Sequence, residues 1–345
     1  MNILMPIQSV EEMIPLIESG ATEFYCGYIS LKWKTRYNKI KGDGILQISL
    51  NNRDREKTNF ENVDDLQNAV RVCEKYKKTL YLTLNSKWFP QECFIELNSY
   101  IQEIQDIGIK HLIVSDIGLI NFLSINYPDM KLSISCLNEI YNSASVDFYK
   151  QFNPERIVFP RHIDIRDVEM IVNEHKSIDF EVFVLSDKCI YDDGNCRCFH
   201  DWGPICQENW STNYIGRKGT NMITREFLDQ IEDYSTKFLR WSNDYYVGNK
   251  DIYKWSHVGC SICALFNLVQ IPNLVSYKVV GRGYKLEEKI FQAQLVNKVI
   301  KKVINGASIE SLMEYMEDFS GEKTFCQSGM HCIMRGYKIE KNRIY

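Results

Sequence analysis

The sequence predicts an α/β fold, a (β/α)8 TIM-barrel-like domain with a long cysteine-bearing insertion after the seventh strand. Eight short segments rich in β-branched and aromatic residues recur along the chain, and most are continuous apolar runs, as in parallel strands covered on both faces. Polar turns and apolar residues at a helical period follow them. An open doubly wound sheet has the same local pattern, but eight alternations of strand and helix favour a closed barrel.

The predicted strands are, in order, Ile3–Pro6, Glu23–Cys26, Leu80–Asn85, His111–Asp116, Lys131–Cys136, Arg156–Pro160, Phe180–Leu185 and Ser276–Val280. Helix signals lie between them. Ser9 and Glu12 are spaced as in a capping box, and Asp164 precedes an apolar stripe typical of a helix. Gly20 and Gly108 stand where a helix would end before the next strand.

Two connections are too long for simple barrel loops: residues 27–62 after the second strand and residues 186–262 after the seventh. Both begin at the carboxyl ends of strands, where barrel proteins assemble their sites. We therefore expect one barrel-like domain over residues 1–305, which includes the insertion at 186–262. Residues 306–345 are expected to form a C-terminal helix, Ile309–Phe319, and a tail.

The 345-residue chain is 45% hydrophobic and 25% charged, which is ordinary for a globular protein and excludes fibrous and unfolded classes. Its formal net charge of -4 argues against a surface built to hold nucleic acid, and we expect no DNA partner. Residues 32–41 are a local exception, because basic residues alternate there with Trp33 and Tyr37. Such a stretch could track phosphates and stack bases, or it could be a solvated insertion.

No apolar run reaches the roughly 18 residues needed to span a bilayer, and the segment from Met1 to Leu4 does not resemble a secretory signal. We expect a cytoplasmic protein without a membrane span. In that reducing compartment, cysteines are more often ligands, redox groups or small core residues than disulfides.

Eight of the twelve cysteines lie in three short groups: Cys189, Cys196, Cys198 and Cys206, then Cys260 and Cys263, then Cys326 and Cys332. Four thiolates on irregular backbone suit a structural zinc or an iron–sulfur cluster. A four-cysteine zinc site usually has paired C-x2-C motifs, and only one such motif occurs in these groups, which favours iron–sulfur. The scattered Cys26, Cys73, Cys93 and Cys136 are expected to be buried apolar residues, although Cys26 and Cys136 lie near strand ends and could face the site.

Several motifs follow one another in a fixed order along the chain. Each segment is similar to the pattern given after it: Gly20–Gly27 (G-A-D-x-x-Y-x-G), Asp116–Gly118 (D-x-G), Ile134–Ala144 (S-x-Q-x-x-x-x-N-x-x-A), Cys189–Cys196 (C-x6-C), Gly203–Gln207 (G-x-C-x-Q), and Cys263 before Lys278–Arg282 (K-I-E-G-R). In these motifs the sequence resembles the peptidase U32 family. It departs from the family pattern at Arg161-His162, Leu185-Ser186 and Val280, where R-E, H-G and the glutamate of K-I-E-G-R are common. Changes at charged positions indicate a divergent branch.

The resemblance implies a barrel-like fold and, for several members, a [4Fe–4S] cluster that supports oxygen-independent hydroxylation of a ubiquinone precursor or of RNA bases. Carried over residue by residue, it implies Cys189, Cys196, Cys206 and Cys263 as the cluster ligands. The remaining Cys198, Cys260, Cys326 and Cys332 could build a second site or replace one of these ligands.

Six residues at or beside predicted strand ends are our candidates for substrate binding: Asn85, Asp116, Ser135, Arg161, Lys278 and Arg282. For each of them a helix cap or a barrel salt bridge is the structural alternative. Arg161 and Arg282 could hold a carboxylate or phosphate in bidentate fashion, or form buried ion pairs. No catalytic residue is assigned, since none of His162, His200, His257 and His331 stands out.

We therefore expect an iron–sulfur-dependent redox enzyme that carries out oxygen-independent hydroxylation, or a related modification, of a small molecule, a peptide or an RNA base. A protein partner or an electron donor fits this chemistry. One alternative is a cluster-bearing partner subunit without catalytic activity. The other is a protease, although the sequence has no H-E-x-x-H or G-x-S-x-G motif.

Overall fold

The computed structural model describes residues 1–41, 44–52, 58–185, 193–195, 224–226, 229–230, 232–233, 259–320 and 332–334. Eight parallel strands form a closed barrel in the order β1-β10-β9-β8-β7-β6-β5-β2. Their bounds are β1 Asn2–Pro6, β2 Glu23–Cys26, β5 Thr79–Leu84, β6 His111–Val114, β7 Lys131–Ile134, β8 Arg156–Val158, β9 Asp179–Leu185 and β10 Leu274–Val279. The predicted (β/α)8 TIM-barrel-like fold is confirmed.

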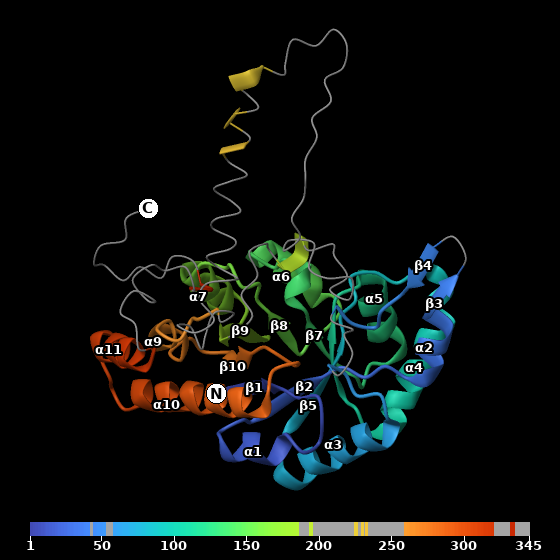
Figure 1. The fold of residues 1–345 in the computed structure, drawn as a ribbon, viewed down its shortest axis with the longest axis horizontal. Coiled ribbons are helices and arrows are strands. Elements are labelled where there is room, and N and C mark those ends of the chain that lie inside the picture. The colour runs from blue at the N-terminus through green and yellow to red at the C-terminus, as the bar shows by residue number, and fades with distance from the viewer. Residues whose placement is uncertain are drawn as a thin grey trace.

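Helices surround the barrel (Figure 1). They are α1 Met13–Glu18, α2 Leu31–Tyr37, α3 Val63–Tyr76, α4 Phe94–Ile107, α5 Ile117–Asn126, α6 Ser143–Lys150, α7 Ile165–Glu174, α9 Leu265–Leu268, α10 Leu286–Ile304 and α11 Ile309–Ser320, with short 3-10 turns η1 Gln91–Cys93, η2 Cys136–Asn138 and η3 Asp193–Asn195. Gly108 ends α4 with a φ of 103°, and Gly20 follows α1 with a φ of 110°, as their positions predicted. The apolar stripe of α7 faces the core through Val168, Ile171 and Val172.

The predicted capping box at Ser9 and Glu12 is wrong. Helix α1 begins at Met13, and Glu12 makes no side-chain cap. Instead, the Glu12 carboxylate accepts hydrogen bonds from the Gln8 amide at 3.0 Å and from Lys289 Nζ at 2.8 and 2.9 Å. Because Lys289 is fully buried on α10, its ammonium requires an acidic partner, and this requirement determines the position of Glu12.

In the basic stretch at 32–41, the two aromatic residues fit neither alternative, base stacking nor a solvated insertion. Trp33 and Tyr37 are buried in the core, and Trp33 Nε1 donates to the Ile48 carbonyl at 2.7 Å. The stretch forms α2 and one strand of a hairpin that the sequence did not predict, β3 Asn38–Lys41 paired antiparallel with β4 Gly44–Gln47. Figure 1 shows this hairpin at the edge of the molecule, beside α2 and α4.

The barrel interior has a polar layer beneath an apolar one. Arg156 Nη2 lies 2.8 Å from Glu23 Oε1, and Arg156 Nη1 lies 3.0 Å from Glu181 Oε2. Lys278 Nζ lies 2.9 Å from Glu181 Oε1, and Ser276 Oγ donates to Glu23 at 2.8 Å. Each buried charge therefore has an opposite partner, as burial requires. Above this layer lies the interior cluster, which we define as Leu4, Tyr25, Tyr81, Ile113, Cys136, Val158, Phe183, Val280 and Ile333, with Leu137 beside it.

Asp164 caps α7 as predicted, and replacing it should lower the stability of the protein measurably. Its carboxylate accepts the Arg166 amide at 2.9 Å. We expect Asp164→Ala to lower the free energy of unfolding by about 1 kcal/mol at neutral pH, and Asp164→Asn, which keeps the cap, to lower it less. Chemical denaturation of the three proteins measures this.

The same site has a pH dependence. The hydrogen bond from the Arg166 side chain lowers the pKa of Asp164 below its ordinary 3.8. Its charge therefore adds stability above that pH, and the contribution is lost as the pH falls further. The difference in the free energy of unfolding between the wild type and Asp164→Asn should become smaller in acid. A larger difference in acid would contradict the role given to the Asp164 charge.

Within the described residues, no helix is long and apolar enough to cross a membrane. The helix expected at Ile309–Phe319 corresponds to α11. The boundary at 305/306, the extent of the insertion and the cytoplasmic location remain predictions.

Candidate active site at the carboxyl end of the barrel

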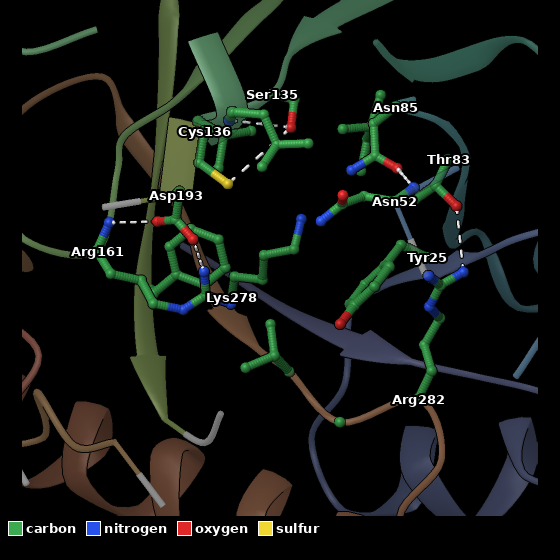
Figure 2. Close-up of a pocket in the computed structure, with 16 residues that line it drawn as sticks. Tyr25, Asn52, Thr83, Asn85, Ser135, Cys136, Arg161, Asp193, Lys278 and Arg282 are labelled. Carbon is green, nitrogen blue, oxygen red and sulfur yellow. Dashed lines mark hydrogen bonds and ion pairs between the residues drawn. The ribbon is translucent and has the colours of Figure 1, made fainter. Parts of the chain in front are cut away.

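A pocket with a volume of about 100 Å³ opens where the strands end. It is lined by Tyr25, Asn52, Thr83, Asn85, Ile113, Ser135, Cys136, Leu137, Val158, Arg161, Phe183, Asp193, Lys278, Val280, Gly281 and Arg282. Figure 2 shows Lys278 extending between the Arg161–Asp193 pair on one side and the Asn52 and Asn85 side chains on the other. Among the described lining residues, three cations and two amides thus face one small space, and Asp193 is the one acidic residue.

The structure brings together five of the six residues proposed to bind substrate: Asn85, Ser135, Arg161, Lys278 and Arg282. The sixth, Asp116, does not line the pocket. Its carboxylate caps α5 by accepting the Leu119 amide at 2.7 Å, and it also accepts the Phe89 amide at 3.0 Å. A role for the other five in binding remains a prediction.

Sequence reasoning did not identify Tyr25, Asn52, Thr83 and Asp193 as part of this site. Tyr25 and Thr83 lie inside predicted strands, where period-2 alternation could have assigned them to the interior. Asn52 and Asp193 lie on long connections that return to the barrel, and no local pattern indicates such a return.

Arg161 holds the turn η3 at the pocket. Its guanidinium forms an ion pair with Asp193, and its backbone amide donates to Asp193 Oδ2 at 2.9 Å. Lys87 Nζ donates to the carbonyl of Gly194, next in the chain. Of the two alternatives for Arg161, the buried ion pair is therefore present. These contacts hold η3, Asp193–Asn195, at the pocket, and Cys196 is the next residue in the sequence.

Lys278 connects the pocket to the polar layer beneath it. Its ammonium pairs with Glu181 and lies 4.5 Å from the centre of the Tyr25 ring. Burial raises the pKa of Glu181, but the charges of Lys278 and Arg156 outweigh burial and hold that pKa below its ordinary range. Glu181 is therefore ionised at neutral pH and keeps Lys278 in place.

Arg282 is held by neutral groups in the part of the chain that the structure describes. Its guanidinium donates to Asn59 at 2.8 Å, Asn51 at 3.0 Å and Thr83 at 3.3 Å. Gly27 allows this arrangement, because a Cβ there would overlap Asn59 and approach Arg282 Nη1 to 2.6 Å. Asn51, Asn59 and Thr83 thereby help to hold the Arg282 guanidinium at the pocket.

Cys136 lines the pocket but is a poor nucleophile. Burial raises the pKa of its thiol to about 12, and the charge of Asp193 adds to the increase. We expect alkylation of Cys136 by iodoacetamide to be slow at neutral pH and to accelerate about tenfold per pH unit below that pKa. Peptide mapping of the reduced protein measures this, with the part-exposed Cys332 as the comparison thiol. Equal rates for the two at neutral pH would contradict it.

The proposed cluster ligands fall mostly outside the described residues. Cys189, Cys196 and Cys206 lie there, as do Cys198 and Cys326. Cys263 is described, part-exposed, just before α9. Nearby, Cys260 Sγ accepts the Ile262 amide at 3.5 Å, a contact that suits a thiolate. No group of three or more His, Cys, Asp or Glu in the described part is placed to hold a metal ion.

Two chain positions next to proposed ligands nevertheless reach the same end of the barrel. The turn η3, Asp193–Asn195, directly precedes Cys196 in the sequence. The segment Cys260–Cys263 lies beside the end of β9, where the Ser261 amide donates to the Val184 carbonyl at 2.8 Å. Thiolates delivered there would suit an iron–sulfur cluster near the pocket, so the residues present are compatible with that group.

The sequence profile of peptidase family U32 matches residues 8–332. The chain belongs to this family. The match extends from the loop after β1 to Cys332 in the tail, and therefore covers the pocket and every cysteine group discussed above.

Three named proteins are similar in sequence to this U32 family member. The "tRNA hydroxylation protein P" of Escherichia coli strain K12 is 26% identical over 303 residues, which is 76% of this chain and 64% of that protein. The Haemophilus influenzae protein of the same name is 27% identical over 198 residues, 56% of this chain and 38% of that protein. A "Collagenase" of Porphyromonas gingivalis is 24% identical over 315 residues, 88% of this chain and 66% of that protein.

The chain thus spans less than two thirds of the length of the two proteins named for tRNA hydroxylation. A solved structure of a U32 peptidase has 10% identity and a TM-score of 0.40, covering 53% of this chain and 68% of that one.

Proposed function

We propose that this protein hydroxylates a base of an RNA substrate without molecular oxygen, using a [4Fe–4S] cluster held by Cys189, Cys196, Cys206 and Cys263. The observation that carries the proposal is the pocket at the carboxyl end of the barrel, where three cations and two amides converge. The similarity to two proteins named for tRNA hydroxylation supports RNA as the substrate.

The pocket residues divide into two groups by chemistry. Asn52, Asn85 and Ser135 offer donors and acceptors of the kind that read the edge of a base turned out of its stack. Arg161, Lys278 and Arg282 supply positive charge for a phosphate or another anionic group. A cavity of about 150 Å³ admits one benzene ring, so a pocket of about 100 Å³ accepts one ring only if its lining moves slightly.

The cluster, when bound, would supply electron transfer. The chain's own residues perform the other tasks. Asp193, held by Arg161, keeps the turn η3 at the barrel mouth. Glu181 holds Lys278 toward the pocket, where the ammonium can orient an anionic group or stabilise developing negative charge.

Proteolysis, the activity suggested by the name of the Porphyromonas relative, is less well supported. Hydrolysis of a peptide requires an activated nucleophile. In the described lining of the pocket, the thiol of Cys136 is protonated at neutral pH and no histidine is present to activate it.

The proposal predicts a specific product in cells. The full chain is expressed without oxygen in a bacterial host whose own tRNA hydroxylation genes are deleted, so that the cell supplies electrons and the oxygen donor. Mass spectrometry of tRNA nucleosides should reveal one base heavier by a single oxygen atom. Lys278→Met and Arg282→Met should reduce this product about tenfold or more, because each variant loses a charged hydrogen-bond donor for the substrate.

Lys301→Met is the matched control, because Lys301 is exposed in the last turn of α10, away from the pocket. It should leave the product unchanged. If no tRNA or rRNA nucleoside gains oxygen in cells that contain folded, iron-loaded protein, the RNA proposal is wrong. A product that forms only in air would exclude the oxygen-independent route.

A further inference from the structure

Three residues of the C-terminal tail lie against the barrel mouth. Cys332 forms a parallel bridge with Cys260, and the Ile333 amide donates to the Cys260 carbonyl at 3.0 Å. Cys260 forms an antiparallel bridge with Leu185, the last residue of β9. The tail is therefore connected to the end of a barrel strand through consecutive backbone contacts.

The tail also inserts a side chain into the barrel. Ile333 is 1% exposed and belongs to the interior cluster, together with Cys136, Phe183 and Val280. Those three residues line the pocket. Removing Ile333 from this position would expose apolar surface at the pocket, so the docked tail acts as a cover for one side of the barrel mouth.

The bridge brings the backbones of Cys260 and Cys332 within the range of a disulfide. Partners in a parallel bridge have Cα atoms about 4.8 Å apart and side chains on the same face. Disulfides form at Cα separations of about 4.4–6.8 Å, so little backbone movement is needed. Both residues are part-exposed and not disulfide-bonded, whereas Cys26, Cys73, Cys93 and Cys136 are buried.

We propose that Cys260 and Cys332 are a redox-sensitive thiol pair, which a small-molecule disulfide oxidises to a protein disulfide that locks the tail over the barrel mouth. One cysteine thiolate attacks the reagent, forming a mixed disulfide and releasing one thiol. The second thiolate then attacks the protein sulfur of that intermediate, closing the bond and releasing the second thiol. Two electrons pass from the cysteine pair to the reagent, and the two cysteine protons go to the released thiols.

The consequence is control of access to the pocket. In the reduced protein, the contacts of Cys332–Met334 include the hydrogen bond from the Ile333 amide to Cys260 and the burial of Ile333, and local opening breaks both. In the oxidised protein the bond closes the loop between residues 260 and 332 and restricts the open state. This inference does not depend on the proposed reaction, and it involves none of the four proposed cluster ligands.

Peptide mapping of the full chain tests the bond. The protein is equilibrated anaerobically at several ratios of reduced to oxidised glutathione, free thiols are alkylated, and tryptic peptides are identified by mass spectrometry. Cys260 lies in peptide 255–278 with Cys263, and Cys332 lies in peptide 324–335 with Cys326. We expect these peptides to become linked, and fragmentation to place the link between Cys260 and Cys332.

Two variants locate the bond independently. Cys332→Ser should abolish the link, and Cys326→Ser, which changes the other cysteine of the same peptide, should retain it. No link at any ratio, or a link that Cys332→Ser leaves intact, would overturn the proposal.

Hydrogen exchange tests the effect on the tail. Exchange of the Ile333 amide should slow at least about tenfold on oxidation in the wild type and be unaffected by glutathione in Cys332→Ser. Equal exchange in oxidised and reduced wild type would show that the bond, if formed, does not hold the cover.

Discussion

Arg156→Met is expected to lower the free energy of unfolding by about 3–5 kcal/mol, because it removes one partner from a buried ion network. The Arg156 guanidinium contacts Glu23 at 2.8 and 2.9 Å and Glu181 at 3.0 Å, and its side chain is 4% exposed. After the replacement, Lys278 still contacts Glu181, whereas no cation among the described residues contacts Glu23. Urea denaturation at neutral pH measures the loss.

Two further measurements separate this cause from a loss of packing. The double variant Glu23→Gln/Arg156→Met should lose less stability than the two single changes together, because it removes an unpaired charge. The pKa of Glu181 also lies below its ordinary 4.5, so its pairing adds stability above that pH and loses it as the pH falls. The effect of Arg156→Met should therefore shrink in acid. A constant effect from neutral pH to acid would contradict the electrostatic explanation.

Replacing Cys263 by alanine is expected to remove the iron from the purified protein. A [4Fe–4S] cluster requires about four thiolate ligands, and loss of one commonly releases or degrades it. Iron and sulfide should fall from about four of each per chain toward zero. The visible absorption of the cluster and the proposed hydroxylation should be lost with them. Anaerobic purification followed by metal analysis measures the change.

The controls for this experiment come from the same chain. Cys73→Ala changes a buried cysteine of α3 and should keep the iron. Cys260→Ser should also keep it if Cys260 is paired with the tail. Loss of iron from Cys260→Ser with retention in Cys263→Ala would exchange the roles of these two residues. Zinc without iron in the wild type would contradict the cluster itself.

The barrel was predictable because its signals are local. Each strand is a short apolar run, such as Leu112-Ile113-Val114, and each is paired in the closed sheet. The hairpin β3–β4 was missed because the stretch from Asn38 to Gln47 carries polar and charged residues that do not read as strands. Trp33 and Tyr37 were misread because burial against Ile48 and α4 depends on contacts distant in sequence.

The site was partly predictable for a similar reason. A barrel places strand ends on one face, which located Asn85, Ser135 and Lys278 at the pocket. The pairing of Arg161 with Asp193 joins residues on different connections, and the bridge between Cys260 and Cys332 joins residues separated in the sequence by α9, β10, α10 and α11. Pairings of this kind leave no periodic trace in a single sequence. Asp116 shows the converse problem, because a strand-end aspartate can cap the next helix as readily as it can bind a ligand.

The position of β10 in the sequence has a consequence for how the chain is made. β10 closes the barrel by pairing with β1 on one side and β9 on the other, yet residues 186–273 separate it from β9. During synthesis, seven strands can therefore assemble while two open edges, β1 and β9, still present unpaired amides and carbonyls. These edges stay open until Leu274–Val279 leaves the ribosome, and this interval is when the nascent chain most needs a chaperone to prevent edge-to-edge association.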